Sequence, residues 1–265
     1  MTTLDARLNR ALAATDPDEK LALVTALAAD WKKGLLTTQA RTPQALVCGR
    51  PAKPELVPHH QVKQRGPHSP EGRAALIHAI AHIEFSAINL ALDHAARFHD
   101  MPADYVGDWI GVAAEEAYHF RLLRDHLRSY GYDYGSFPAH EGLQQMAERT
   151  TDDVLARMAL VPRLLEARGL DATPPIQAKL KQAGDHEAVR LLDIILHDEI
   201  EHVGLGDKWF RRLCAERGLE PETTYREILD HFRAPRPLPP MNVEARLAAG
   251  FSAAELAALA PGKPG

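Results

Sequence analysis

The sequence contains few cysteines and no uninterrupted apolar run, and each scarcity excludes a class of protein. Only Cys48 and Cys214 occur among 265 residues, which provides no disulfide framework and favours a reducing compartment. Charged residues interrupt the apolar stretches within a few positions, so we expect no segment that spans a bilayer. The N-terminus also lacks the basic and then apolar order of a secretory signal. These absences predict a cytoplasmic protein with no membrane partner.

The charge of the chain is unevenly distributed. A net charge of −5 gives no general reason to expect nucleic-acid binding. Residues 31–73 contain eight basic and two acidic residues, so this segment has a charge of +6 and the remainder has −11. Two interpretations stay open. The segment is either a solvated covering strap or a surface for an anionic partner, such as a nucleic acid or a phosphorylated molecule.

Helical periodicity dominates the rest of the sequence. Asp16 and Pro17 predict the start of a helix that reaches about Thr37. The proline-rich residues 41–69 predict an extended arm that packs on the surface. Four long helical patterns follow, with apolar positions three and four residues apart. They cover approximately 70–99, 103–130, 141–168 (interrupted at 171–175 and continued to 183) and 185–217, and short helices are expected near 222–232 and 252–259.

No strand pattern of any length appears, so the predicted class is all-α. We divide the chain into three parts. Residues 1–69 form N-terminal helices and the covering arm, residues 70–218 form a four-helix bundle, and residues 219–265 form a C-terminal extension packed on the bundle.

Two Glu-x-x-His motifs lie at the centres of apolar helical patterns, and a further glutamate precedes each motif by 32 or 33 residues. The six residues are Glu84, Glu116, His119, Glu166, Glu199 and His202. Positions i and i+3 are neighbours on one helix face, so the Glu and His of each motif can reach the same ion. Four carboxylates and two imidazoles in this order match the ligand set of a carboxylate-bridged dinuclear metal site in a four-helix bundle.

Charge balance supports the same assignment. An ionised carboxylate inside a helical bundle is very costly unless it is paired or coordinated. Two divalent cations would balance the four carboxylates, while both histidines bind as neutral imidazoles. Symmetry about the intervening turns places each upstream glutamate opposite its motif. We expect Glu116 and Glu199 to bridge the two ions and Glu84 and Glu166 to be terminal ligands.

Three nearby residues could support these ligands. Glu115 and Asp198 precede the two histidines by one helical turn and could accept their second N–H. The equally open alternative is that both are solvated acids. Pro162, four residues before Glu166, indicates either a bulge that aims Glu166 or a break between two helices.

Other histidines and arginines predict no further site. We expect surface or core positions for six other histidines because no third ligand accompanies them; these are His78, His82, His94, His126, His186 and His197. Three arginines near the second motif are expected to be ion-pair partners of acidic residues; these are Arg157, Arg163 and Arg168. No residue beyond the metal ligands is assigned a catalytic role.

Several runs of sequence resemble a bacterial ferritin-like family known only as a domain of unknown function. These runs are GRAALIHAIAHIEFSAINLALD, DWIGVAAEEAYHF, RMALVPRLLEARGLD and HDEIEHVGLGDKWF. The resemblance covers approximately residues 45–260 and implies a ferritin-like bundle with the metal-ligand pattern on the same six residues. It further implies a distant relationship to the tRNA-hydroxylating di-iron monooxygenases.

Together these observations predict a non-haem di-iron oxidoreductase. Its cofactor would be two iron ions, with manganese as an alternative metal, and its partners would be O₂, an organic substrate and an electron-donor protein. A ferroxidase or iron-handling protein is the first alternative, and a di-manganese or di-iron peroxide-scavenging protein is the second. Length favours the oxidoreductase, because the arm and the C-terminal extension could wall a substrate pocket. The sequence indicates neither the substrate nor the oligomeric state.

Overall fold

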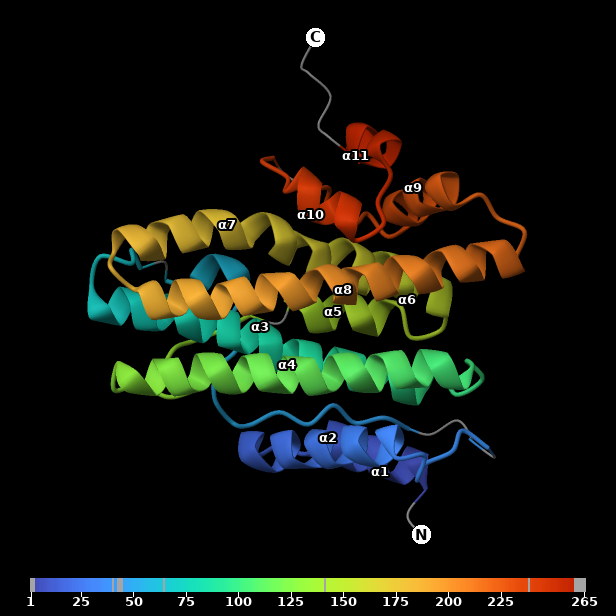
Figure 1. Cartoon of the computed structure of the whole chain (residues 1–265), viewed down its shortest axis with the longest axis horizontal. Coiled ribbons are helices and arrows are strands. Elements are labelled where there is room, and N and C mark those ends of the chain that lie inside the picture. Colours follow the sequence, from blue (N-terminus) through green and yellow to red (C-terminus); the bar gives the residue numbers. More distant parts are fainter. Residues whose placement is uncertain are drawn as a thin grey trace. The chain divides into compact units, whose positions relative to one another are not determined.

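The structure, a computed structural model, describes residues 3–39, 41, 45–63, 65–140, 142–237 and 239–259. These residues form eleven α-helices, one π-helical segment and one short 3₁₀ turn (Figure 1). They contain no strand, and a bridge between Leu56 and Ala139 is the one β interaction among them. The predicted all-α class is confirmed for this part of the chain. The chain divides into two compact units, Met1–Gln145 and Met146–Gly265.

The first unit is built on a hairpin of two long helices, α3 (Pro70–Arg97) and α4 (Ala103–Ser129) (Figure 1). The hydroxyl of Ser69 accepts a hydrogen bond from the Gly72 amide (3.0 Å) and caps α3, as its sequence predicts. Two shorter helices cover the hairpin: α1 (Leu4–Ala13) packs on α3, and α2 (Pro17–Lys32) packs on α4. The hairpin therefore provides the core of this unit.

Helix α2 begins where the sequence predicts and ends earlier than expected. The carboxylate of Asp16 caps it by accepting a hydrogen bond from the Glu19 amide (2.8 Å). The helix ends at Lys32 instead of near Thr37. Gly34 explains the difference, because its φ of 68° turns the chain out of the helical path, as a glycine after a helix C-terminus commonly does.

The arm packs on the first unit through its backbone and one buried arginine. The Val57 amide donates to the Ala139 carbonyl (2.8 Å), and the Ala139 amide donates to the Glu55 carbonyl (2.9 Å). Arg41 forms an ion pair with Asp5 (2.7 Å), and its guanidinium also donates to two carbonyls at the end of α3. The predicted packing of the arm is confirmed for its described part; residues 42–44 and 64 lie outside it.

The second unit contains a second hairpin. The first side of this hairpin runs without interruption through α6 (Val154–Leu160), the π-helical segment η2 (Val161–Glu166) and α7 (Ala167–Gln182). The second side is α8 (His186–Glu216), which packs on all three of these segments. The C-terminal helices are α9 (Pro221–His231), α10 (Val243–Ala248) and α11 (Ala253–Leu259), while the short helix α5 (Gly142–Arg149) spans the junction of the two units.

Two expectations for the second unit were wrong. The third helical region does not begin as one helix near residue 141, because α5 ends at Arg149 and Asp153 caps a new helix by accepting from the Leu155 amide (3.1 Å). The Pro174–Pro175 pair does not interrupt α7 either. Pro174 cannot donate to the Leu170 carbonyl, and the side-chain amide of Asn242 donates to that carbonyl instead (3.2 Å).

Helix α3 also corrects the expectation that no segment could span a bilayer. Among the described residues it is the one helix long and apolar enough to do so. However, 61% of its most apolar window is buried inside the structure. This burial is consistent with the core helix of a soluble protein.

Candidate metal centre

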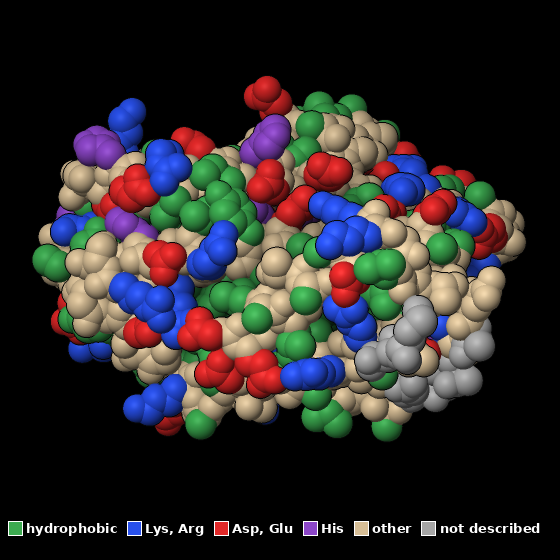
Figure 2. All heavy atoms as spheres, turned by 60° about the horizontal axis from the view of Figure 1, so that its bottom comes forward, with side chains coloured by type: hydrophobic (Ala, Val, Ile, Leu, Met, Phe, Trp, Pro, Cys, Tyr) green, Lys and Arg blue, Asp and Glu red, His purple; other side chains and the backbone are tan. Residues whose placement is uncertain are grey.

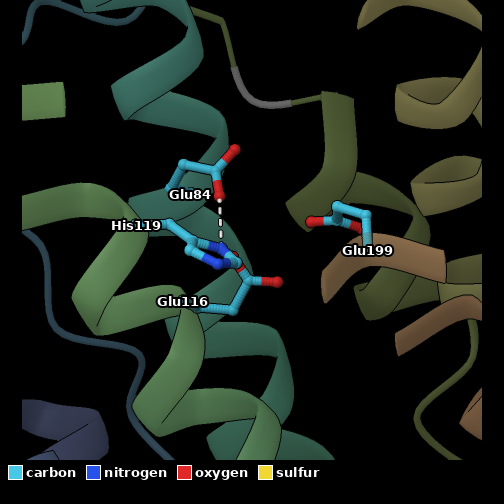
Figure 3. A group of neighbouring side chains, drawn as sticks. All are labelled: Glu84, Glu116, His119 and Glu199. Carbon is cyan, nitrogen blue, oxygen red and sulfur yellow. Dashed lines mark ion pairs between the residues drawn. The ribbon is translucent and has the colours of Figure 1, made fainter. Parts of the chain in front are cut away.

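The first unit places three of the predicted ligands together. Glu84 lies on α3, and Glu116 and His119 lie one turn apart on α4. All three side chains are buried, with relative exposures of 3%, 0% and 0%. The Nδ1 atom of His119 is 3.3 Å from an Oε2 atom of Glu84 and 3.6 Å from Oε2 of Glu116 (Figure 3). The hairpin therefore directs two carboxylates and one imidazole toward one point.

The electrostatics of this group favour a positive charge. Burial disfavours the charged imidazolium, but hydrogen bonds to Glu116 and Glu84 and the charges of both raise the pKa of His119 to about 11. Without a metal ion, a proton on His119 partly neutralises the two carboxylates. A divalent cation could replace that proton and provide a larger positive charge.

The second unit repeats the layout on α8. Glu199 and His202 lie one turn apart and have exposures of 9% and 0%. Their arrangement matches that of the first motif, because His202 Nδ1 is 3.8 Å from Glu199 Oε1. Glu166, the last residue of η2, is half-buried. Each unit thus contains one Glu-x-x-His pair with the imidazole Nδ1 facing the carboxylate of the same helix.

The π-helical segment resolves the two interpretations of Pro162. Pro162 lies inside η2, which is continuous with the helices on both sides, so it marks a bulge and not a break. Segments of this kind occur often at functional sites. Helix α8 approaches the bulge closely at Gly206, where a Cβ atom would lie 2.6 Å from Pro162 Cβ. A glycine in the apolar pattern of α8 was the sequence signal for this contact.

Three predicted ligands of the first unit could hold a metal ion together. Glu84, Glu116 and His119 each offer one ligand atom, and these atoms lie within 4.8 Å of one another (Figure 3). Carboxylate oxygens and an imidazole nitrogen suit divalent iron, manganese or zinc. The donor set therefore fits a metal ion without selecting among these elements. Glu166, Glu199 and His202 belong to the second unit, and their role as ligands remains a prediction.

The two predicted supporting acids differ in exposure. Glu115 is exposed on α4, whereas Asp198 is half-buried on α8. Their predicted role as hydrogen-bond partners of the histidines remains a prediction.

His78 is a core histidine with 0% exposure, whereas His82 is half-buried, and both are hydrogen-bonded within the first unit. The Gly135 amide donates to His78 Nε2 (2.9 Å), and His82 Nδ1 lies 2.8 Å from the Tyr134 hydroxyl. His82 Nε2 lies 3.2 Å from the His140 carbonyl, which can only accept, so Nε2 carries the proton and Tyr134 donates to Nδ1. Burial is the main cause that lowers the pKa of both histidines to about 4.

The three arginines near the second motif have different roles. Arg163 forms ion pairs with Asp207 (2.7 Å) and Glu255, which confirms the prediction for this residue. Arg157 donates to the Thr150 hydroxyl (2.7 Å) and to a backbone carbonyl. Arg168 is exposed.

The basic segment 31–73 has fewer free cations than its composition suggests. The side chain of Arg41 is 2% exposed and paired with Asp5, and Arg65 pairs with Glu71 (3.1 Å). Arg73 donates to the Tyr130 hydroxyl (3.1 Å). On the face that Figure 2 shows, Lys and Arg side chains are interspersed with Asp and Glu. These interactions involve three of the eight basic residues, and both interpretations of the segment remain predictions.

Fold and site together define an all-helical protein with a buried carboxylate–histidine cluster. The chain belongs to the family described as "Protein of unknown function (DUF455)", which matches residues 13–257. It is similar to an "Uncharacterized protein" of Haemophilus influenzae (strain ATCC 51907 / DSM 11121 / KW20 / Rd), with 48% identity over 221 residues, or 81% of this chain and 77% of the relative. No solved structure matches the chain. The resemblance to a family of unknown function is thereby confirmed.

Proposed function

We propose that this chain is a ferritin-like, carboxylate-bridged di-iron oxidoreductase that uses O₂ to oxidise an organic substrate. One observation supports this proposal above all others. The two units contain half-sites with the same internal layout, in which a buried histidine Nδ1 faces a glutamate of the preceding helical turn at 3.6 Å and 3.8 Å.

The energetics of the buried carboxylates favour a metal site over a structural role. Glu84, Glu116 and Glu199 are at most 9% exposed. Taking a carboxylate out of water costs several kcal/mol even after relaxation, and neighbouring carboxylates also repel one another. One proton on His119 offsets a single negative charge. Two divalent cations would offset all four carboxylates of the six-residue set.

Six ligands suit two ions better than one. In this proposal Glu84 and His119 would hold one ion, Glu166 and His202 would hold the other, and Glu116 and Glu199 would be shared by both ions. Glu199 is the buried glutamate of the second motif, with 9% exposure, and would be the second bridging ligand. Glu166 would complete the set from the π-helical segment.

The chemistry divides between the metal and the chain. When bound, two ferrous ions would supply electrons for the reduction of O₂. The four carboxylates would balance the charge of the two ions, and the histidines would bind as neutral imidazoles. The apolar neighbours on the same helices exclude water, because Ala81 and Ile88 flank Glu84 with 0% exposure and Ile195 precedes Glu199 with 3% exposure. An electron-donor protein would reduce the ions again after each turnover.

Anaerobic titration with Fe(II) followed by exposure to O₂ tests the proposal. We expect binding to saturate at two irons per chain, followed by oxidation that builds no mineral core. Hundreds of irons per assembly would instead identify an iron-storage protein. Manganese binding with peroxide removal would identify a scavenging enzyme. Fewer than two ions per chain would overturn the dinuclear site.

Matched variants control this titration. Glu116→Gln keeps the size of the side chain but removes its charge, so we expect it to lose dinuclear binding. Glu216→Gln removes a charge from the exposed end of α8, where Glu216 pairs with Arg212 (2.9 Å), so it should bind iron as the wild type does.

A further inference from the structure

Arg163 is the centre of a buried ion network in the second unit. Its side chain is 0% exposed, its Nε donates to Asp207 Oδ1 (2.7 Å), and its guanidinium also pairs with Glu255. Arg211 pairs with the remaining oxygens of both acids, at 2.7 Å and 2.8 Å. Two arginines and two acids therefore neutralise one another. The network joins η2 and α8 to α11, close to the C-terminus.

Aromatic rings enclose the Arg163 guanidinium and hold it in place. Its central carbon lies 4.0 Å from the ring centre of Tyr225, 4.5 Å from that of Phe251 and 5.1 Å from that of Phe210. A planar guanidinium with fixed partners on its edge and rings on its faces has little freedom to move. The backbone of η2 is thereby fixed three residues before Glu166.

The C-terminal segment also holds the chain immediately after Glu166. Arg246, with 0% exposure, donates to the Ala167 carbonyl (3.2 Å) and forms two hydrogen bonds with the carboxylate of Asp171 (2.9 Å and 2.6 Å). Asn242 donates to the Leu170 carbonyl (3.2 Å). Residues 242–255 therefore contact four residues around Glu166, which are Arg163, Ala167, Leu170 and Asp171.

The same segment packs on α8 beside the second motif. A Cβ atom at Gly204, two residues after His202, would lie 3.7 Å from the Ala249 carbonyl oxygen. At Gly250, with φ of 99°, a Cβ atom would lie 2.7 Å from an Asp207 carboxylate oxygen, so only glycine fits there. The C-terminal segment thus contacts both sides of the second hairpin, which contain the predicted ligands of this unit.

We propose that residues 242–255 are a clamp that positions Glu166 against Glu199 and His202, with Arg163 as the central positioning residue. This inference rests on the proposed dinuclear site. The π-helical segment needs such a clamp because it departs from the regular α-helical ladder and Pro162 has no amide hydrogen to donate. The first half-site lies on two regular helices and is independent of the clamp.

Anaerobic Fe(II) titration of full-length variants tests the clamp. Glu255→Gln removes one acid of the Arg163 network, and Asp171→Asn removes the partner of Arg246 while leaving that network intact. Loss of a supporting contact weakens metal binding roughly 10- to 100-fold. We expect this loss for the second iron alone, while the first iron binds as in the wild type. Glu216→Gln on α8 is the control and should bind two irons normally.

The outcomes separate the clamp from the function on which it rests. Variants that melt at a lower temperature but bind both irons with wild-type affinity would show a purely structural role and overturn the inference. A wild type that does not bind two irons would contradict the proposed function instead. If Glu255→Gln does not fold, Asp171→Asn still tests the clamp through the contacts of Arg246, because it leaves the Arg163 ion pairs in place.

Discussion

The two half-sites share a sequence motif but differ in how their residues are held. In the first unit, Glu84, Glu116 and His119 project from two regular helices, and His119 lies within 3.6 Å of both carboxylates. In the second unit, Glu166 ends a π-helical segment and is half-buried. Regular helical periodicity is enough to place the first set. The second depends on an irregular turn and on contacts from a remote part of the chain.

This difference has a physical consequence for metal binding. The first set has two carboxylates and a histidine already together, so an ion there replaces a proton without rearrangement of the backbone. The second set needs η2 to be held in place. We therefore expect the first ion to bind more tightly and to be less sensitive to changes elsewhere in the chain.

Removing a bridging glutamate should have the largest effect. We expect Glu116→Ala and Glu199→Ala to abolish dinuclear binding, because each carboxylate would serve both ions. Glu84→Ala and Glu166→Ala, which remove terminal ligands, should each lose one ion. The number of irons bound per chain, determined after gel filtration, measures these losses. Two irons retained by Glu116→Ala would refute the bridging assignment.

Metal loading should stabilise the protein. At a free metal concentration 100 times the Kd, binding adds about 2.7 kcal/mol to the free energy of unfolding. We expect the loaded protein to melt at a higher temperature than the metal-free protein in calorimetry. Glu116→Ala should reduce this difference, because the variant loses dinuclear binding. Equal melting temperatures for loaded and metal-free wild type would contradict the buried site.

Two glycine substitutions compare the close helix contact of the second unit with an open site in the first. We expect Gly206→Ala to destabilise the protein by about 1–3 kcal/mol, because the new methyl group would meet Pro162 Cβ at 2.6 Å. Gly111→Ala on α4 meets no atom within 4 Å, so it should stabilise by about 0.4–1 kcal/mol. Urea denaturation measures the change in the free energy of unfolding for both variants. A Gly206→Ala variant as stable as Gly111→Ala would show that the contact is not tight.

Acid should destabilise the first unit through its buried histidines. The pKa of His78 and of His82 is lowered to about 4 in the folded chain, against 6.5 when exposed. Between these values the unfolded chain binds more protons, so stability is intact above pH 6.5 and falls as the pH decreases toward 4. From pH 7 to pH 5 the loss is roughly 2 kcal/mol for each histidine.

His78→Gln isolates one of these contributions. The glutamine can still accept from the Gly135 amide but cannot titrate, so its unfolding free energy should depend less on pH. The exposed His186 provides the control, because His186→Gln should leave the pH dependence unchanged. An unaltered slope in His78→Gln would refute the lowered pKa.

The regular parts of the fold followed from the sequence because they depend on local chemistry. Asp16, Ser69 and Asp185 each cap the helix that the sequence predicts. The Glu84, Glu116 and His119 group also followed, because periodicity on two straight helices fixes which side chains share a face.

The irregular parts depend on contacts that local patterns do not encode. The Pro174–Pro175 pair predicts a break, yet Asn242 satisfies the carbonyl that Pro174 leaves free, 68 residues away in sequence. Pro162 alone could not distinguish a bulge from a break, since the outcome depends on Gly206 of α8. The sequence predicted that Arg163 forms an ion pair with acidic residues. It did not predict that these acids are Asp207 and Glu255, because the sequence does not specify which acids lie near Arg163.

Locating the metal ions tests the central claim most directly. Crystals of the iron-loaded protein, measured at the iron absorption edge, would give the ion positions from anomalous scattering. We expect two peaks per chain, roughly 3.5–4 Å apart, one beside Glu84 and His119 and the other beside Glu166 and His202. A single peak at His119, or a second peak without Glu166 or His202 beside it, would contradict a site shared by the two motifs.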